Sequence, residues 1–128
     1  MNKTIFGIGV IFGVLAISLG AFGAHGLKSV LDTAALSSFE TGVTYQMYHA
    51  LVLLIVAIIP GFPKVEKRKI GIVFTVGVVL FSFSIYLLAT ASVTGFSVSS
   101  IALVTPLGGM VLIIGWLLLG YRVFKHFS

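Results

Sequence analysis

Few side chains in this sequence could do chemistry, since its 128 residues include three histidines, three acids and no cysteine. The most concentrated group is YQMYH at 45–49, where Gln46 and His49 stand three positions apart and share one helical face. A neutral histidine both donates and accepts a hydrogen bond, so this pair could bind an ion, a proton or a small ligand. His25 stands apart, inside GAFGAHGLK at 20–28.

A structural interpretation of the same residues is the alternative, and we favour it. Gln46 and His49 would then bond to polar side chains of neighbouring helices and hold those helices in register. For His25, a role in capping or bridging the turn is favoured over ligand binding. The candidate polar cluster consists of His25, Tyr45, Gln46, His49, Ser82 and Tyr86.

Enzymatic chemistry is not expected. Acid–base catalysis needs paired titratable groups, whereas Asp32 and Glu40 are predicted on one side of the membrane and Glu66 on the other. No catalytic residue, metal site or cofactor is predicted, because no nucleophile motif, phosphate loop or tightly spaced ligand set is present. The net charge of +5 does not indicate nucleic-acid binding either, since the basic residues form no single face with interleaved aromatics.

The composition places these residues in a membrane. The chain is 59% hydrophobic and 9% charged, with a mean hydropathy of +1.20, whereas soluble domains are about a quarter charged. Eleven charged side chains cannot cover the surface of a soluble domain of this size. The sequence therefore predicts an integral membrane protein whose main partner is lipid.

Four apolar runs are long enough to cross a hydrocarbon core of about 30 Å as helices. They span about 5–24, 41–60, 70–91 and 106–121, within a single transmembrane domain covering 1–128. The fold class is therefore all-α, an integral membrane four-helix bundle. Pro60 should end the second span, Thr105 should cap the fourth with Pro106 at its first position, and Gly26 should end the first in a left-handed conformation.

The basic residues are distributed unequally about these spans. One side holds only Lys28, and the other holds Lys3, Lys64, Lys67, Arg68, Lys69, Arg122 and Lys125. Because basic residues near span ends stay cytoplasmic, both termini are predicted inside, in the cytoplasmic cell membrane. The basic loop 61–69 would attract anionic lipid, and Trp116 and Tyr121 would join an aromatic belt at this side.

The segment 26–40 is predicted outside as a short amphipathic helix resting on the membrane surface. A plain loop is the alternative. The first apolar run also imitates a cleavable secretory signal, but it is longer than the usual apolar region and three more spans follow it. We therefore interpret it as a retained span.

Small residues predict where helices approach closely. Gly9 and Gly13 form a GxxxG pattern in the first span, and such a face lets another backbone come near. Packing within the bundle is favoured over a homo-oligomer interface, which stays open. The glycines assigned to helix packing are Gly9, Gly13, Gly20, Gly23 and Gly108.

Four blocks together resemble one family: GAFGAHGLK at 20–28, FETGVTYQMYHALVLL at 39–54, FSFSIYLLA at 81–89 and TPLGGMVLIIGWLLL at 105–119. The chain is similar to domain-of-unknown-function family 423, also called uncharacterised protein family 0382. The resemblance implies a four-helix inner-membrane protein without an established activity. Phe83 departs from the family pattern, which often has a small residue there, and this puts a tight contact at Phe83 in doubt. The family blocks map onto Gly20, Gly23, His25, Gly26, Tyr45, Gln46, His49, Thr105, Pro106 and Gly108.

The leading functional hypothesis is a non-enzymatic structural or accessory four-helix bundle. The alternative is a small transporter or channel that uses the polar cluster around His49 and works as an oligomer, because four helices leave little room for a pore. Its ion or small-molecule ligand is not identified by the sequence.

Overall fold

The computed structural model describes all 128 residues, and every regular element in it is a helix. Four helical segments are long and apolar enough to cross a membrane, which confirms the all-α four-span prediction. The third segment is built from α3, the π-helix η1 and α4. The elements are α1 (Lys3–His25), α2 (Thr33–Ile58), α3 (Lys64–Val78), η1 (Val79–Phe83), α4 (Ser84–Ala89), α5 (Ala91–Thr94), α6 (Val98–Ile101) and α7 (Val104–Phe127).

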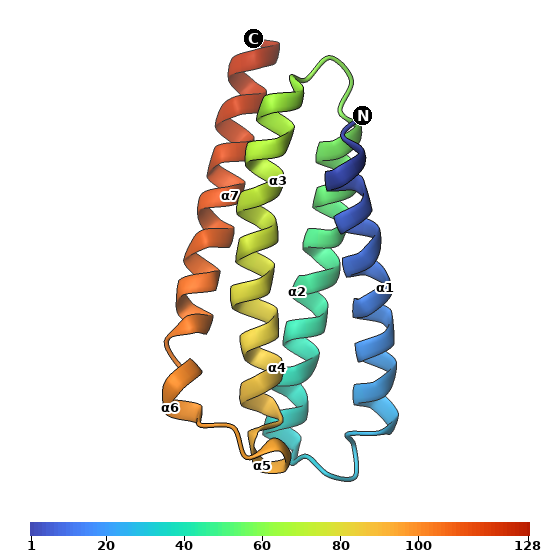
Figure 1. Cartoon of the computed structure of the whole chain (residues 1–128), viewed down its shortest axis with the longest axis vertical. Coiled ribbons are helices and arrows are strands. Elements are labelled where there is room, and N and C mark those ends of the chain that lie inside the picture. The colour runs from blue at the N-terminus through green and yellow to red at the C-terminus, as the bar shows by residue number, and fades with distance from the viewer.

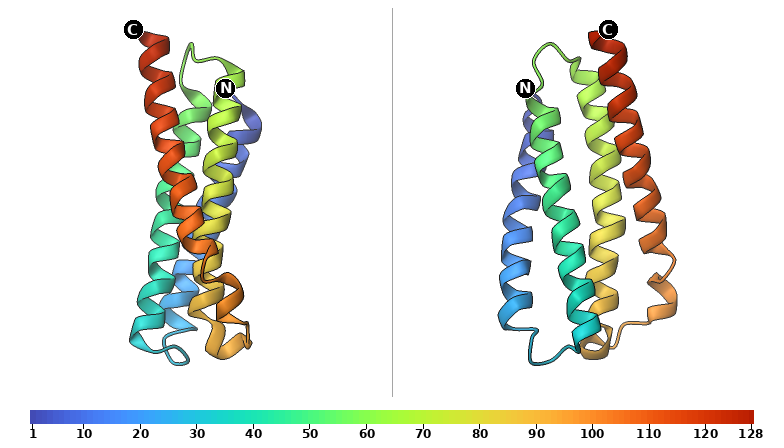
Figure 2. Two further views of the ribbon diagram at one scale, coloured as in Figure 1. Left: turned by 90° about the vertical axis from the view of Figure 1, so that its left-hand side faces the viewer. Right: turned by 180° about the vertical axis from the view of Figure 1, so that it is seen from behind.

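The four long segments run up and down in sequence order, so both chain termini lie at one end of the bundle (Figure 1). The helix α1 packs on α2, while α7 packs on α3 and η1. Helices α1 and α7 therefore flank the bundle on opposite sides, as the right-hand view of Figure 2 also shows. The end with the termini also carries the 59–63 connection, and α5, α6 and the 26–32 turn lie at the other end.

The core lies between α2 and the α3–η1–α4 segment. Its larger cluster is centred on Leu53, Phe74 and Val78, none of which has any exposed surface. Most of the remaining apolar side chains point outward; Ile17 and Ile113, for example, are each more than 60% exposed. Outward apolar surface of this extent suits a chain whose surroundings are lipid.

The separate surface helix predicted between the first two spans is wrong. Residues 26–32 form a turn, and α2 begins at Thr33 because the Asp32 carboxylate accepts a hydrogen bond from the Ala35 N–H at 2.7 Å. Three apolar side chains of the predicted stripe, Leu27, Leu31 and Phe39, are buried in a second cluster with Ala89 of α4, whereas Val30 is 53% exposed. Half of the stripe therefore faces protein, not the membrane surface.

Two predicted helix boundaries also differ. Gly26 has φ −72° and ψ −38°, an ordinary right-handed conformation, and its N–H bonds to the Phe22 carbonyl. The helix α7 begins at Val104, so Thr105 lies inside its first turn. The Thr105 hydroxyl does not cap the helix; it contacts the Ser84 hydroxyl at 2.5 Å and joins α7 to α4.

The predicted basic loop 61–69 is largely helical, since α3 begins at Lys64. One of its residues, Lys67, is only 4% exposed and donates to the Ala57 carbonyl at 3.0 Å. That carbonyl belongs to the last turn of α2, where lysine complements the negative end of the helix dipole. The Asn2 N–H donates to the same carbonyl at 3.0 Å. The ends of α1, α2 and α3 are thereby joined at one atom.

Close helix approach depends on particular glycines. A Cβ on Gly108 of α7 would lie 2.4 Å from the Phe81 backbone nitrogen, so α7 crosses directly over the backbone of η1. A Cβ on Gly9 would lie 3.0 Å from the Ala50 carbonyl oxygen of α2. By contrast, a Cβ on Gly13 would meet nothing within 4 Å. Gly13, the second glycine of the GxxxG pattern, therefore contributes nothing to packing within the bundle.

Gly20 and Gly23 face the N-terminal half of α2. A Cβ on Gly20 would lie 3.3 Å from Val43, and one on Gly23 would lie 3.0 Å from the Phe39 ring. Phe83, where a tight contact was in doubt, packs edge-on against Phe12 of α1 with ring centres 6.2 Å apart. The small face of the first span is thus applied to α2 along most of its length.

We expect Gly108→Ala to lower the free energy of unfolding by about 1–3 kcal/mol, because the added methyl overlaps backbone atoms that cannot move alone. Gly13→Ala is the matched control and should not lower stability, since its methyl enters open space and alanine favours the helix. Unfolding of the purified protein in detergent, followed by tryptophan fluorescence, measures both. Equal stability of the two variants would contradict the close crossing of α7 over η1.

Candidate functional site

Gln46 is the centre of the polar cluster. Its side chain is completely buried, its Nε2 donates to the Phe12 carbonyl at 2.9 Å, and its Oε1 accepts from the Tyr86 hydroxyl at 2.6 Å. Phe12 belongs to α1 and Tyr86 to α4, so one amide on α2 joins three helices. The structure thus brings Gln46 and Tyr86 into direct contact.

Ser82 forms a second polar bond next to this one. Its hydroxyl is fully buried in η1 and donates to the Gly42 carbonyl of α2 at 2.8 Å. Gly42 has no side chain to hold the helices apart, and a Cβ there would lie 2.7 Å from the Tyr86 ring. Gln46, Ser82 and Tyr86 therefore form one group between α2 and the η1–α4 segment.

His49 faces the other way, toward α7. Its Nε2 accepts from the Trp116 indole N–H at 3.1 Å, and its Nδ1 lies 2.6 Å from the Tyr45 carbonyl. Because an indole N–H can only donate, Nε2 must be the acceptor and Nδ1 must carry the ring proton toward Tyr45. His49 is 3% exposed, and both of its ring nitrogens have partners.

Trp116 is the residue that sequence reasoning misplaced. We expected it in an aromatic belt at the end of the fourth span, but α7 continues to Phe127 and Trp116 lies near the middle of that helix. Its ring meets Phe74 edge-on, with centres 5.8 Å apart, besides bonding to His49. The sequence signal that could have placed it correctly was its separation from the basic residues that end the fourth span. An indole N–H that lies deep in a membrane needs a hydrogen-bond acceptor from the protein.

The side chains of the two remaining candidates, Tyr45 and His25, form none of these hydrogen bonds. The Tyr45 ring stacks on the His49 ring with centres 6.4 Å apart and is 41% exposed. His25 is exposed at the last residue of α1 and, like the Tyr45 hydroxyl, does not enter the network. Gly23 packs on Phe39, which precedes His49 by ten residues, about 15 Å along α2. The two histidines therefore do not meet.

A groove of about 520 Å³ lies between α2 and α7 in front of His49. Its walls are mainly apolar and aromatic, with Tyr45 and His49 as the polar contributors from the candidate cluster. No group of three or more His, Asp or Glu side chains suited to a metal ion occurs anywhere in the chain. The residues that line the groove are Thr41, Tyr45, His49, Phe81, Pro106, Gly109, Met110, Leu112, Ile113 and Trp116.

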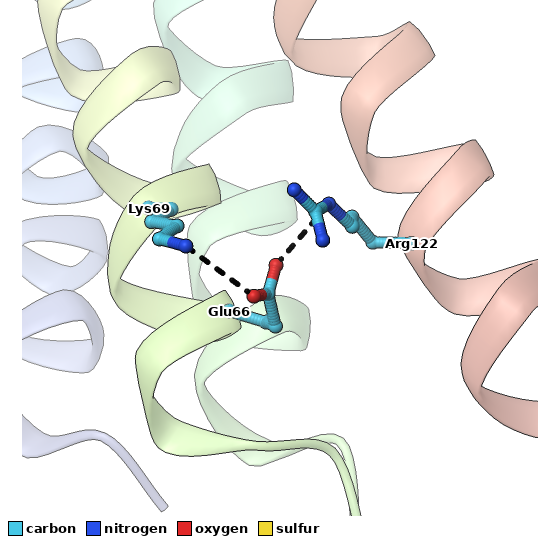
Figure 3. A network of polar contacts seen from close by, with 3 residues as sticks. All are labelled: Glu66, Lys69 and Arg122. Atoms are coloured by element: carbon cyan, nitrogen blue, oxygen red, sulfur yellow. Dashed lines mark ion pairs between the residues drawn. The ribbon is translucent and has the colours of Figure 1, made fainter.

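A group of charged side chains, which the sequence did not predict, joins α3 to α7 at the end with the termini. Glu66 lies between Lys69, at 3.6 Å from its Oε1, and Arg122, whose Nε is 3.3 Å from its Oε2 (Figure 3). The Arg122 contact is an ion pair rather than an aligned hydrogen bond, since neither atom has a hydrogen-bond partner. Sequence reasoning placed Glu66 in a loop, where a fixed contact to the fourth span was not expected.

We expect Tyr86→Phe to lower the free energy of unfolding by about 0.5–2 kcal/mol, because it leaves the buried Gln46 oxygen without its donor. Tyr48→Phe removes the same hydroxyl from an exposed ring of α2 and serves as the control. Unfolding of both variants in the same detergent gives the comparison. A loss as large in Tyr48→Phe as in Tyr86→Phe would contradict the bridging role of Gln46.

Comparison with known proteins identifies related sequences. A family model described as "Protein of unknown function (DUF423)" matches residues 19–109. The UPF0382 membrane protein SSP2132 of Staphylococcus saprophyticus is 40% identical, over 92% of this chain and 94% of its own. The UPF0382 membrane protein YwdK of Bacillus subtilis is 40% identical over 93% and 94%, and one from Haemophilus influenzae is 39% identical over 91% and 90%.

No solved structure matches the chain. The family model and these relatives confirm the family resemblance drawn from the four sequence blocks. The matched range contains His25, Gln46, His49 and Tyr86. The matches to named membrane proteins agree with the four membrane-length helices. This four-helix membrane protein belongs to the DUF423 family.

Proposed function

We propose that this protein is a non-enzymatic structural or accessory component of the cytoplasmic membrane, a bundle whose interior polar groups serve to hold its own helices together. The observation that carries the proposal is the hydrogen bonding of the Gln46 amide. Its oxygen accepts from Tyr86 of α4, and its nitrogen donates to the Phe12 carbonyl of α1. A side chain with both groups engaged inside the protein has little capacity left for a ligand.

The positions of the acids support the non-enzymatic assignment. Asp32 caps α2, and Glu66 is paired with two cations at the opposite end. Glu40 precedes His49 by nine residues of helix, about 13 Å along the axis. His49 therefore has no carboxylate beside it to form the acid–base pair that catalysis commonly uses.

The same pairing weighs against the alternative, a small transporter or channel acting as an oligomer. Transport through the polar cluster would need side chains that can release their partners and accept a passing ion. Gln46 and His49 are each bonded at two positions, and the groove in front of His49 is mainly apolar. We therefore keep the structural function and test the other directly.

Substitution of the buried polar residues separates the two functions. Gln46→Leu and His49→Leu should each lower the free energy of unfolding by about 1–3 kcal/mol, because their former partners become unpaired in the membrane interior. Proton permeability of proteoliposomes, measured with an enclosed pH-sensitive dye, should equal that of empty liposomes for the wild type and both variants. Thr44→Leu, on an exposed position of α2, is the control for stability.

The opposite pattern would refute the structural function. In that pattern, wild-type proteoliposomes would dissipate a pH gradient, while Gln46→Leu or His49→Leu would abolish the flux and keep the wild-type stability. Thr44→Leu should keep whatever flux and stability the wild type has.

The proposed orientation places both termini in the cytoplasm, because seven of the eight basic residues lie in segments at that end of the bundle. Green fluorescent protein fused after Ser128 should fluoresce, and alkaline phosphatase fused there should be inactive. Phosphatase fused after residue 30, behind α1 alone, should be active and serves as the control. An active phosphatase after Ser128 would reverse the orientation.

A further inference from the structure

A small charged groove lies between α3 and α7 at the end of the bundle that holds the termini. It has a volume of about 240 Å³ and is lined by Phe62, Glu66, Arg122, Lys125 and His126. It is distinct from the groove at His49, which lies farther along α7 at Trp116. We call it the basic groove.

One wall of the basic groove is held in shape by contacts between His126 and the 59–63 connection. The His126 Nε2 lies 2.8 Å from the Gly61 carbonyl, and the His126 ring meets the Phe62 ring edge-on with centres 5.5 Å apart. Phe62 itself is only 4% exposed. The last turn of α7 is thus fixed to the 59–63 connection, which gives the groove a defined wall.

Glu66 positions Arg122 without neutralising the groove. The carboxylate reaches the Arg122 Nε at 3.3 Å, while its other oxygen faces Lys69 at 3.6 Å (Figure 3). The Arg122 contact with Glu66 is made through Nε, at the base of the guanidinium group. Of the residues that line the groove, Arg122 and Lys125 are positive and Glu66 is negative, which gives a net charge of +1. Lys69, which lies beside Glu66 but does not line the groove, adds a further positive charge nearby.

We propose that the basic groove binds the phosphate headgroup of an anionic phospholipid. A guanidinium braced at Nε presents its terminal amino groups as a fork, which matches two phosphate oxygens. Arg122 and Lys125 follow directly on the apolar stretch of α7, which places them at the depth of lipid headgroups. The exposed Leu117 of α7, about two turns before Lys125, offers apolar surface for the acyl chains.

Lipid binding to the full-length protein tests this site. The protein in a neutral detergent is titrated with dioleoyl phosphatidylglycerol or dioleoyl phosphatidylcholine, and bound lipid is counted by native mass spectrometry. We expect the phosphatidylglycerol to bind at least tenfold more tightly. Lys125→Gln should weaken its binding about fivefold, the effect of one basic residue near a lipid headgroup, and Arg122→Gln should weaken it more.

Lys28→Gln is the matched control, because Lys28 is the single basic residue at the other end of the bundle and is exposed. It should leave phosphatidylglycerol binding unchanged. Lys125 makes no ion pair, so Lys125→Gln keeps the test valid even where Arg122→Gln, which frees Glu66, impairs folding.

Three results would overturn the proposal. Equal affinity for the two lipids would exclude headgroup recognition, and an equal loss in Lys28→Gln and Lys125→Gln would reduce the effect to overall charge. Displacement of bound phosphatidylglycerol by an equal concentration of inorganic phosphate would show a phosphate site rather than a lipid site. None of these results bears on the structural function, which depends on Gln46 and not on the basic groove.

Discussion

Lipid offers no hydrogen bonds, so a polar side chain inside a membrane bundle must find its partners within the protein. Gln46 is the residue on which this constraint acts most strongly, because it is completely buried and has both a donor and an acceptor to satisfy. Its bonds to Phe12 and Tyr86 fix α1 and α4 at one level of α2. A sliding or rotated helix would leave at least one of these groups unpaired, so a single amide specifies the register of three helices.

The packing around Gln46 follows from the need to bring these partners close. Gly42 lets the Tyr86 ring and the Ser82 hydroxyl approach the backbone of α2, and Gly9 lets α1 approach the Ala50 carbonyl of α2. On the far side, Gly108 lets α7 cross the backbone of η1. The π-helix widens the third segment at this level; its Ser82 bonds to α2 while the Phe81 backbone lies under α7.

The two ends of the bundle differ in how their polar groups are used. At the end with the turn 26–32, Asp32 caps α2, and Leu27 and Leu31 of that turn are buried in a cluster with Ala89 of α4. At the end with the termini, Lys67 joins three helix ends, and Glu66 links α3 to α7 through Arg122. The excess of positive charge there is what supports both the cytoplasmic assignment of the termini and the lipid site.

The sequence alone determined properties that depend on local composition: four apolar helices, the separation of basic residues to one side, and polar residues at depth on the second span. It also identified Gln46, His49, Ser82 and Tyr86 as one set, because their depth follows from counting along each helix. Only the tertiary structure decided that this set divides, with Gln46 bonded to a carbonyl 34 residues away and His49 to an indole 67 residues away. Helical spacing defines which residues share a face, but the helix opposite that face is chosen by packing between segments distant in the chain. For the same reason, the stripe at 27–39 was correctly apolar, yet its Leu27, Leu31 and Phe39 face protein instead of membrane.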